Sequence, residues 1–429
     1  MIVPLVFLMA ALVGVIFAIN GHRPFAREGG LSIWSFFAGW LTSELPIHHL
    51  AWQILATVVF VWAGALTAWP GFLALALVVG SWVGLIRMFR QAAGAADVVE
   101  RALVEALGPD YAARLDPAER ARLGLPQPFA RLLVPFWRRH AEVERLTGLA
   151  YGPCGRRNQL DIYRPRASGE RRPVIVQVHG GAWILGDKSQ QGVPLMIHMA
   201  SLGWVCVAIN YRLSPRATFP DHIVDVKRAL AWVKAHIAEY GGDPDFVVIT
   251  GGSAGGHLAA LAALTPNDPE YQPGFEDADT AVQACVPFYG VYDFTNRKGV
   301  GRKDMRDLLG KLVLKRRYAE CPELFDRASP MSRVNDHAPP FLVIHGTHDT
   351  LVPVAEARLF VELLRQASHE PVAYAELPGA QHAFEVFTST RTGHVVRGVA
   401  RFLAFVYATH AAAAPARTAS TQEPAAATV

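Results

Sequence analysis

Long hydrophobic runs without charged residues dominate the first fifth of the chain. Residues Ile2–Ile19 form an uncharged run of 18 residues, and Leu50–Trp69 form a second run of 20. A third run, Phe72–Ile86, follows a Pro-Gly break. Because a helix needs about 20 apolar residues to cross the hydrocarbon core of a bilayer, the pattern predicts a transmembrane anchor of about three helices within residues 1–91.

The flanks and lengths of these runs disfavour other interpretations. Ile2–Ile19 has no basic stretch before it and no small-x-small cleavage site, so an uncleaved anchor is favoured over a signal peptide. A helix buried in a soluble core is usually shorter than these runs. The short aromatic segment Leu31–Trp40 is expected at the membrane interface, where tryptophan is favoured.

Positive charge near the runs predicts how the chain is oriented. With three spans, the segments after the first and the third face the same side of the membrane. Their cationic side chains are His22, Arg23, Arg27, Arg87, Arg90 and Arg101, whereas the turn at 69–71 on the other side carries none. The positive-inside rule therefore predicts an integral protein of the cell membrane with the N-terminus outside and the large C-terminal domain in the cytoplasm.

Beyond the anchor the hydrophobic pattern changes twice. Residues 92–145 alternate charged and apolar positions and contain Gly and Pro breaks, which predicts a helical connector. From 146 to 410, short apolar runs alternate with helical patterns. The expected strands are Val174–Val178, Trp204–Asn210, Phe246–Thr250, Val282–Phe288, Phe341–His345 and Val372–Leu377, and the expected helices are Asp221–Tyr240, Ala254–Leu264, Ala355–Ser368 and Thr392–Tyr407.

Apolar strands that alternate with helices indicate a mostly parallel sheet covered on both faces. The fold class is therefore α/β, doubly wound. The interval Tyr292–Pro340 is longer than a crossover needs and is expected to add to a cap. The Ala/Pro/Thr-rich residues 411–429 have no periodicity and are predicted to be a disordered tail.

Composition narrows the functional classes. Hydrophobic residues make up 51% of the 429 positions and charged residues 18%, with a formal net charge of +4. No Lys/Arg stripe follows a helix or strand pattern, so nucleic acid is not an expected partner. The four cysteines are widely spaced, which fits neither a zinc site nor a disulfide framework and is compatible with a reducing compartment.

The strongest local motif is Gly251-Gly252-Ser253-Ala254-Gly255, between an expected strand and an expected helix. A serine in such a strand-turn-helix adopts a strained backbone, so small neighbours are needed, and the turn lifts its hydroxyl above the sheet. A P-loop would need a lysine that is absent here, and the motif is not GxGxxG. Ser253 is therefore the candidate nucleophile, and Gly251 and Gly255 support its turn.

A second Gly-rich motif, His179-Gly180-Gly181-Ala182-Trp183, directly follows the strand Val174–Val178. Its position fits that of a loop that donates an N–H group to an oxyanion hole near such a serine turn. Its glycines let the backbone approach a substrate carbonyl closely. His179 and Gly180 are expected to support that loop.

A serine hydroxyl needs a base, and the base needs an acid to orient it. Asp349 follows the strand Phe341–His345, and His382 follows Val372–Leu377. The carboxyl ends of parallel strands meet at one edge of the sheet, so these side chains are expected to meet Ser253 there. This common edge is the main argument from the residues for a Ser253–Asp349–His382 triad.

Other polar residues compete for these roles. Asp293 also follows a strand, and a metal cluster of His345, His348 and Asp349 is conceivable, although His345 is expected still to lie in its strand. His257, four residues after Ser253 in the elbow helix, is expected to be structural. The prediction is that no metal and no organic cofactor is required.

These motifs together resemble those of the hormone-sensitive-lipase-like esterases of the α/β-hydrolase fold, and especially actinobacterial membrane-anchored carboxylesterases. The matching stretches are Leu160–Pro165, His179–Trp183, Asn210–Pro215, Gly251–Gly256, His345–Asp349 and Pro378–His382. The resemblance covers about Thr147–Tyr407. It implies Ser253, Asp349 and His382 as nucleophile, acid and base.

The same resemblance implies oxyanion donors from the backbone of Gly181, Ala182 and Ala254. Three positions depart from the family pattern. Ala182 replaces the third glycine of HGGG, while Gly252 and Arg216 stand where the family usually has acidic residues. These changes leave the chemistry intact and bear on the class of substrate.

The predicted function is hydrolysis of carboxylic esters, of a small molecule or of a lipid at the bilayer, through an acyl-enzyme. An amidase, formamidase or peptidase could use the same triad. A non-catalytic binding protein on a hydrolase scaffold would be expected to have lost a triad member. A transporter component is disfavoured because the spans carry no buried charge pair.

Overall fold

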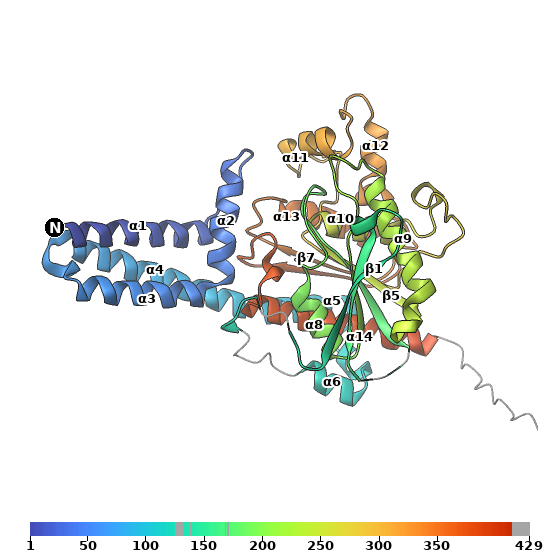
Figure 1. The fold of residues 1–429 in the computed structure, drawn as a ribbon, viewed down its shortest axis with the longest axis horizontal. Helices are drawn as coiled ribbons and strands as arrows, with labels where there is room; N and C mark the ends of the chain where they lie inside the picture. Colours follow the sequence, from blue (N-terminus) through green and yellow to red (C-terminus); the bar gives the residue numbers. More distant parts are fainter. Residues whose placement is uncertain (125–131, 137–138, 168, 170, 414–429) are drawn as a thin grey trace, which may run out of the picture.

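The computed structural model describes the chain except residues 125–131, 137–138, 168, 170 and 414–429. An elongated helical anchor projects from an α/β domain (Figure 1). The anchor comprises α1 (Ile2–His22), α2 (Leu31–Glu44), α3 (Pro46–Trp62) and α4 (Trp69–Ala93). Helices α1, α3 and α4 run alongside one another, whereas α2 stands across their end next to the α/β domain.

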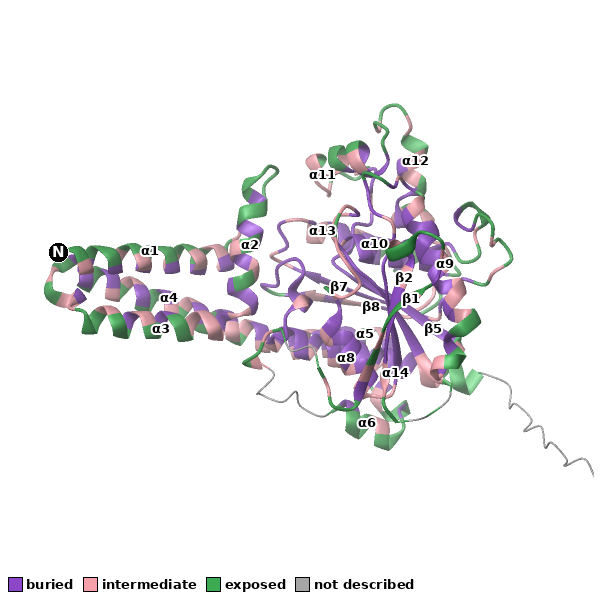
Figure 2. Ribbon diagram, viewed as in Figure 1, coloured by how far each residue is buried: buried purple, intermediate pink, exposed green. Residues whose placement is uncertain are grey.

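Small residues let α1 pack closely against its neighbours. The buried positions of α1 are Pro4, Phe7, Ala11, Gly14, Ala18 and Gly21, which recur every three to four residues and form one stripe. A Cβ on Gly21 would lie 2.5 Å from Cε of Met88 on α4. The opposite face of α1 is exposed (Figure 2) and carries large apolar residues, among them Leu5, Met9, Leu12 and Ile16. Small residues inside and large ones outside are typical of helices that pack together in a bilayer.

The predicted second run, Leu50–Trp69, is wrong as a single helix. Helix α3 ends at Trp62, Gly64 adopts a left-handed φ of 86°, and α4 begins at Trp69. Pro70 lies in the first turn of α4, where a missing N–H costs nothing. The turn therefore occupies residues 63–68, and the third predicted run is the middle of the longer helix α4.

Among the residues that the structure describes, two helices are long and apolar enough by themselves to cross a membrane: α1 and the combined stretch Trp69–Leu107. Helices α2 and α3 meet that criterion only as a pair, and they are bent by 87° at their junction. The placement of Leu31–Trp40 at the membrane interface stays a prediction. These helices are compatible with membrane anchoring.

Helix α4 continues with little interruption into α5 (Ala95–Leu107), whose apolar face is buried against the α/β domain. Val99 and Leu103 of α5 are fully buried in the same core as Val399 of α14 (Thr390–Ala413) and Leu377 of β8 (Val372–Leu377). The predicted connector also holds α6 (Pro117–Leu123). It thus supplies part of the core of the domain.

An eight-stranded sheet forms the centre of the domain, in the order β1-β2-β4-β3-β5-β6-β7-β8. The first strands, β1 (Val143–Ala150) and β2 (Gln159–Pro165), are antiparallel additions that the sequence pattern did not reveal. The remaining strands are parallel to one another. They are β3 (Arg172–Val178), β4 (Val205–Ile209), β5 (Gly242–Gly252), β6 (Cys285–Phe288), β7 (Phe341–Gly346) and β8.

Helices cover both faces of the sheet, which confirms the α/β class. One face carries α5, α8 (Val193–Ser201) and α14, and the other carries α9 (Asp221–His236), α10 (Ala254–Leu264) and α13 (Val354–Ala367). The long interval after β6 forms α11 (Lys303–Leu308) and α12 (Pro322–Arg327). Helix α14 ends at Ala413, and the rest of the predicted tail lies outside the described residues.

Candidate active site

Ser253 lies at the turn between strand β5 and helix α10, and its backbone is strained. Its φ of 58° and ψ of −120° are rare for a residue with a side chain. Strained residues of this kind cluster at functional sites. Its N–H donates to the carbonyl of Phe288 on the neighbouring strand at 2.9 Å, which fixes the turn to the sheet.

The glycines around Ser253 allow approaches that no side chain would permit. A Cβ on Gly255 would lie 2.1 Å from the carbonyl oxygen of Val178, and one on Gly251 would lie 2.5 Å from the backbone of Gly255. A Cβ on Gly180 would lie 2.6 Å from the carbonyl oxygen of Gly252. The two Gly-rich motifs therefore pack directly on each other.

Asp349 and His382 meet as the sequence predicted. Nδ1 of His382 donates to Oδ2 of Asp349 at 2.6 Å, and both residues are at most 6% exposed. The other carboxylate oxygen of Asp349 accepts the N–H groups of Leu351 at 2.9 Å and Val352 at 2.8 Å. The carboxylate is thereby held in one orientation, and it fixes the proton of His382 on Nδ1.

The environment of Asp349 favours its charged form. Burial by itself would raise the pKa of the Asp349 carboxyl, but attraction to His382 and hydrogen bonds from His345 and His382 outweigh it. The pKa of Asp349 therefore lies well below its usual range. An aspartate that stays ionised can orient an imidazole and stabilise its protonated form.

Tyr289 lies between the nucleophile turn and the histidine. Its ring centroid is 4.5 Å from that of His382, and a Cβ on Gly252 would lie 2.6 Å from its hydroxyl. The serine turn and His382 are therefore neighbours across one aromatic side chain. Within the described part of the chain, neither the hydroxyl of Ser253 nor Nε2 of His382 has a hydrogen-bond partner, so the structure joins His382 to Asp349 but not to Ser253 by a hydrogen bond.

The predicted oxyanion loop turns sharply after strand β3. Gly181 and Ala182 have φ values of 112° and 53°. The N–H groups of Gly181, Ala182 and Ala254 make no hydrogen bond to any described residue outside the regular helices. The N–H of Gly180, by contrast, donates to Oε1 of Gln191 at 2.5 Å. Free N–H groups at a turn and at a helix start are suited to bind an oxyanion.

Side chains behind the oxyanion loop hold it in place. The ring of His179 stacks on Tyr211 at 4.4 Å, and the hydroxyl of Tyr211 donates to the carbonyl of His179 at 3.0 Å. The N–H of Ser214 donates to the carbonyl of Trp183 at 2.8 Å. Burial lowers the pKa of His179 to about 4, so this imidazole is neutral at ordinary pH.

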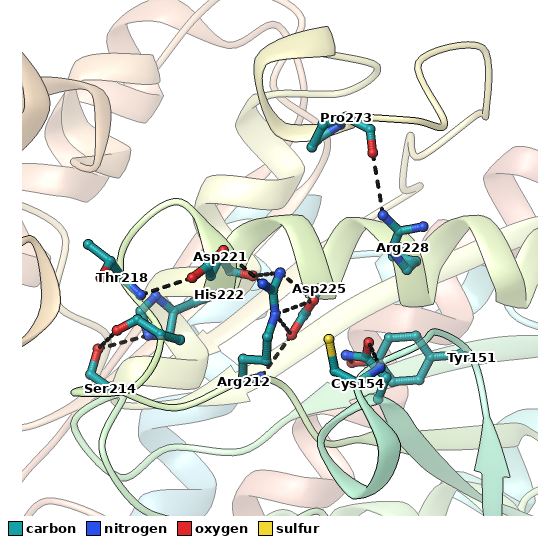
Figure 3. A network of polar contacts seen from close by, with 12 residues as sticks. Tyr151, Cys154, Arg212, Ser214, Thr218, Asp221, His222, Asp225, Arg228 and Pro273 are labelled. Carbon is teal, nitrogen blue, oxygen red and sulfur yellow. Dashed lines mark hydrogen bonds and ion pairs between the residues drawn. The ribbon is translucent and has the colours of Figure 1, made fainter.

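An ion-pair network joins the segment Tyr211–Ser214, which supports the oxyanion loop, to helix α9 (Figure 3). The guanidinium of Arg212 binds Asp225 at 2.9 Å and Asp221 at 2.8 Å. The hydroxyl of Ser214 lies 3.1 Å from Nε2 of His222. These acidic partners come from a helix, and the sequence pattern alone did not pair them with Arg212.

The competing polar residues serve other contacts. Nδ1 of His257 accepts from Nε1 of Trp183 at 3.2 Å, and its other nitrogen contacts the carbonyl of Ala328 at 2.7 Å. Burial lowers the pKa of His257 to about 3. His257 is thus a neutral structural bridge, as expected. Asp293 accepts from Thr295 at the start of its own loop.

The conceivable metal ligands do not converge. His345 lies in strand β7 and points to Asp349 at 3.3 Å and to the carbonyl of Val352 at 3.0 Å. Nδ1 of His348 instead contacts the carbonyl of Gly21 at 3.1 Å. No group of three or more His, Cys, Asp or Glu side chains within the described ranges is placed to hold a metal ion.

Comparison with known proteins identifies the family. The BD-FAE family model matches residues 160–364. The chain is 48% identical to the probable carboxylic ester hydrolase LipM of Mycobacterium tuberculosis, over 95% of both chains. It is 45% identical to the esterase LipQ of the same organism, over 86% of this chain and 84% of that one.

The chain belongs to the hormone-sensitive-lipase-like esterase family.

A solved structure supports the fold. The bifunctional GH43-CE protein of Bacteroides eggerthii is 26% identical, with a TM-score of 0.53, and the match covers 60% of this chain and 35% of that one. The relatives that cover most of the chain are named as esterases or carboxylic ester hydrolases. This family membership makes the chain a carboxylic ester hydrolase.

One departure from the esterase pattern now has a physical reason. Gly252 stands where this family usually carries an acidic residue, and Tyr289 fills the space that a side chain there would need. The hydroxyl of Tyr289 in turn donates to the carboxylate of Glu385, which is fully buried three residues after His382. Burial raises the pKa of Glu385. Sequence reasoning missed both residues, because neither belongs to a recognised motif.

Proposed function

We propose that this esterase cleaves carboxylic esters through an acyl-enzyme on Ser253. Ser253 Oγ attacks the ester carbonyl while Nε2 of His382 takes its proton. The same proton then passes to the leaving alcohol as the tetrahedral intermediate collapses. A water molecule, deprotonated by His382, hydrolyses the acyl-enzyme and regenerates Ser253.

The observation that carries this proposal is the 2.6 Å bond between Asp349 and Nδ1 of His382 beside the strained serine turn. The bond leaves Nε2 as the acceptor that a base needs. The ionised Asp349 stabilises the imidazolium that forms when His382 is protonated. No step requires a metal ion or an organic cofactor.

The oxyanion of the tetrahedral intermediate is assigned to the N–H groups of Gly181, Ala182 and Ala254. Ala254 is the first residue of helix α10, so the helix dipole also favours negative charge at this point. Loss of one such donor typically lowers the rate by about 10²–10³-fold. Ala182 keeps its N–H although the family pattern has a glycine there.

The test compares Ser253→Ala with Ser201→Ala, a matched control at the end of helix α8. With p-nitrophenyl butyrate, Ser253→Ala is expected to lower kcat by about 10⁶-fold, and Ser201→Ala to leave it unchanged. A fluorophosphonate probe should label the wild type and the control only. Wild-type turnover by Ser253→Ala would refute the proposal. Faster cleavage of a matched anilide than of the ester would favour the amidase alternative.

We further propose that α1, α3 and α4 cross the cell membrane and place the catalytic domain in the cytoplasm. The far end of the bundle, with Met1 and the turn at 63–68, carries no charged side chain, whereas Arg87 and Arg90 lie at the end of α4 near the domain. This distribution follows the positive-inside rule.

The exposed thiol of Cys154 reports on this orientation. A membrane-impermeant maleimide applied to intact cells should not label Cys154, and labelling should appear after lysis. A Cys154→Ser variant measures labelling at other thiols. Labelling of Cys154 in intact cells would place the domain outside.

A further inference from the structure

Helix α2 of the anchor lies against the loop that carries His382. The ring of Phe36 meets the ring of His382 edge-on, with centroids 6.1 Å apart. Nε1 of Trp40 donates to the carbonyl of Ala383 at 2.8 Å, and the Trp40 ring lies 4.5 Å from that of Phe387. The residue proposed as the base and the residue after it thus touch the membrane anchor directly.

The same helix also contacts the loop of Asp349. Oγ1 of Thr350 donates to the carbonyl of Ser32 at 3.2 Å. The guanidinium of Arg302, from the segment after β6, binds both Oγ of Ser32 at 2.9 Å and the carbonyl of Thr350 at 2.7 Å. Helix α2 is therefore a wall shared by the loops of Asp349 and His382.

The amphipathic pattern of α2 is the reverse of that of a helix on a water-soluble protein. Its buried residues are mostly small or polar: Ser32, Ser35, Phe36, Gly39, Thr42, Ser43 and Glu44. Its outer residues Ile33, Trp34, Phe37 and Leu41 are 51%, 74%, 50% and 41% exposed. At 100° per residue these outer positions fall on one face. An apolar face of this size that no described residue covers indicates an apolar environment.

Continuity with the anchor identifies that environment. Helix α2 follows α1, whose outer side chains are apolar along its length, and it joins α3 at a bend of 87°. If α1 and α3 cross the bilayer, α2 lies nearly in the membrane plane. Tryptophan and phenylalanine on such a helix favour the boundary between headgroups and acyl chains.

We infer that α2 forms an interfacial wall of the active site, with Phe36 against His382 and the outer face of Trp34 and Phe37 in the bilayer. This inference rests on the proposed function and deepens it, because it specifies the substrate class. The substrates are long-chain esters that are insoluble in water and reside in the membrane. They reach Ser253 from the bilayer side. The outer face of α2 touches lipid, not the reacting atoms.

The test uses full-length protein in phosphatidylcholine vesicles and two esters, water-soluble p-nitrophenyl acetate and membrane-resident p-nitrophenyl palmitate. The Trp34→Glu/Phe37→Glu variant is expected to lower kcat/KM for the palmitate at least tenfold and to change that for the acetate less than twofold. Leu308→Glu, which charges an exposed apolar position on α11, should leave both rates unchanged.

The outcomes separate the two proposals. Wild-type protein that cleaves neither ester would refute the proposed function. Wild-type protein that cleaves both, together with a Trp34→Glu/Phe37→Glu variant that keeps its palmitate rate or loses both rates equally, would overturn the role of α2 alone.

A nitroxide label provides a second measurement that does not depend on activity or on added charge. It is attached to Phe37→Cys in a Cys154→Ser/Cys321→Ser background and examined in the same vesicles. We expect faster relaxation by dissolved oxygen, which partitions into lipid, than by a water-soluble nickel chelate. The opposite order would place this face of α2 in water and overturn the inference.

Discussion

A buried ion pair joins the anchor to the catalytic domain, and its removal should destabilise the whole molecule. Glu44, the last residue of α2, accepts from the guanidinium of Arg391 in the first turn of α14. The other carboxylate oxygen of Glu44 accepts from Oγ of Ser389 at 3.0 Å. Both charged side chains are at most 1% exposed.

The size of the effect follows from what each substitution leaves behind. In Glu44→Ala the guanidinium of Arg391 stays buried and, among the described residues, keeps only a long contact of 3.4 Å to the carbonyl of Pro378. An uncompensated buried charge typically costs about 3–5 kcal/mol. Glu44→Met/Arg391→Met removes both charges and keeps the volume, so its cost should be below about 1.5 kcal/mol.

Thermal unfolding of the detergent-solubilised protein measures these differences. For a domain of this size 1 kcal/mol corresponds to about 2–3 °C. Glu44→Ala should therefore lower the Tm by about 6–15 °C, and the double variant by less than about 5 °C. Esterase activity at 25 °C in the double variant reports whether α2 is still docked against His382.

Two results would refute this reasoning. A Tm for Glu44→Ala within 2 °C of the wild type, where about 6 °C is the smallest expected shift, would mean that the pair is hydrated or absent. A double variant that is less stable than Glu44→Ala would mean that the ionic contact itself, and not the charge left alone, stabilises the junction. The single variant tests whether the charge of Arg391 is buried, and the double variant tests whether the ion pair itself stabilises the junction.

Further predictions concern other buried groups. Asp349→Asn should lower kcat by about 10⁴-fold while substrate KM changes little, measured with p-nitrophenyl butyrate. Burial raises the pKa of Glu356 to about 7 from 4.5, so the stability it contributes is full below pH 4.5 and falls as the pH rises through 7. Relative to Glu356→Gln, the wild type should lose about 3 kcal/mol of unfolding free energy between pH 4.5 and 8, measured by urea titration. Gly255→Ala would place a Cβ 2.1 Å from a carbonyl oxygen, so it should prevent folding, whereas Gly80→Ala, with open space around it inside helix α4, should not lower the Tm.

The parallel core was predictable because its strands are apolar on both faces. The expected strands agree with those of the structure within a few residues, and the expected helix Ala254–Leu264 coincides with α10. Strands β1 and β2 were missed because their sequences contain Arg, Glu and Asp, whose charges are paired only after the sheet forms. Asp161, for example, is fully buried and binds Arg145 and Lys188.

Within the anchor, the ends of the helices were harder to predict than their middles. Hydropathy alone does not distinguish a span from a turn of mostly small, uncharged residues, and the turn at 63–68 contains no charged residue. The contacts of Phe36 with His382, and of Tyr289 with Glu385, join residues far apart in the sequence. No local motif carries such pairings, because they depend on where the chain places whole helices.

The position of His382 depends on the anchor through several elements at once. The loop of His382 begins after β8 and leads into α14, and helix α5 packs against both of these elements. Helix α5 continues α4, so a stretch of 39 residues runs from the bundle into the core. Helix α2 contacts the loop itself through Phe36 and Trp40. A hinge at Gly94, between α4 and α5, would have to break the contacts that α2 makes with this loop. The loop of His382 is therefore held at a fixed angle to α1 and α4, and hence to any bilayer that these helices cross.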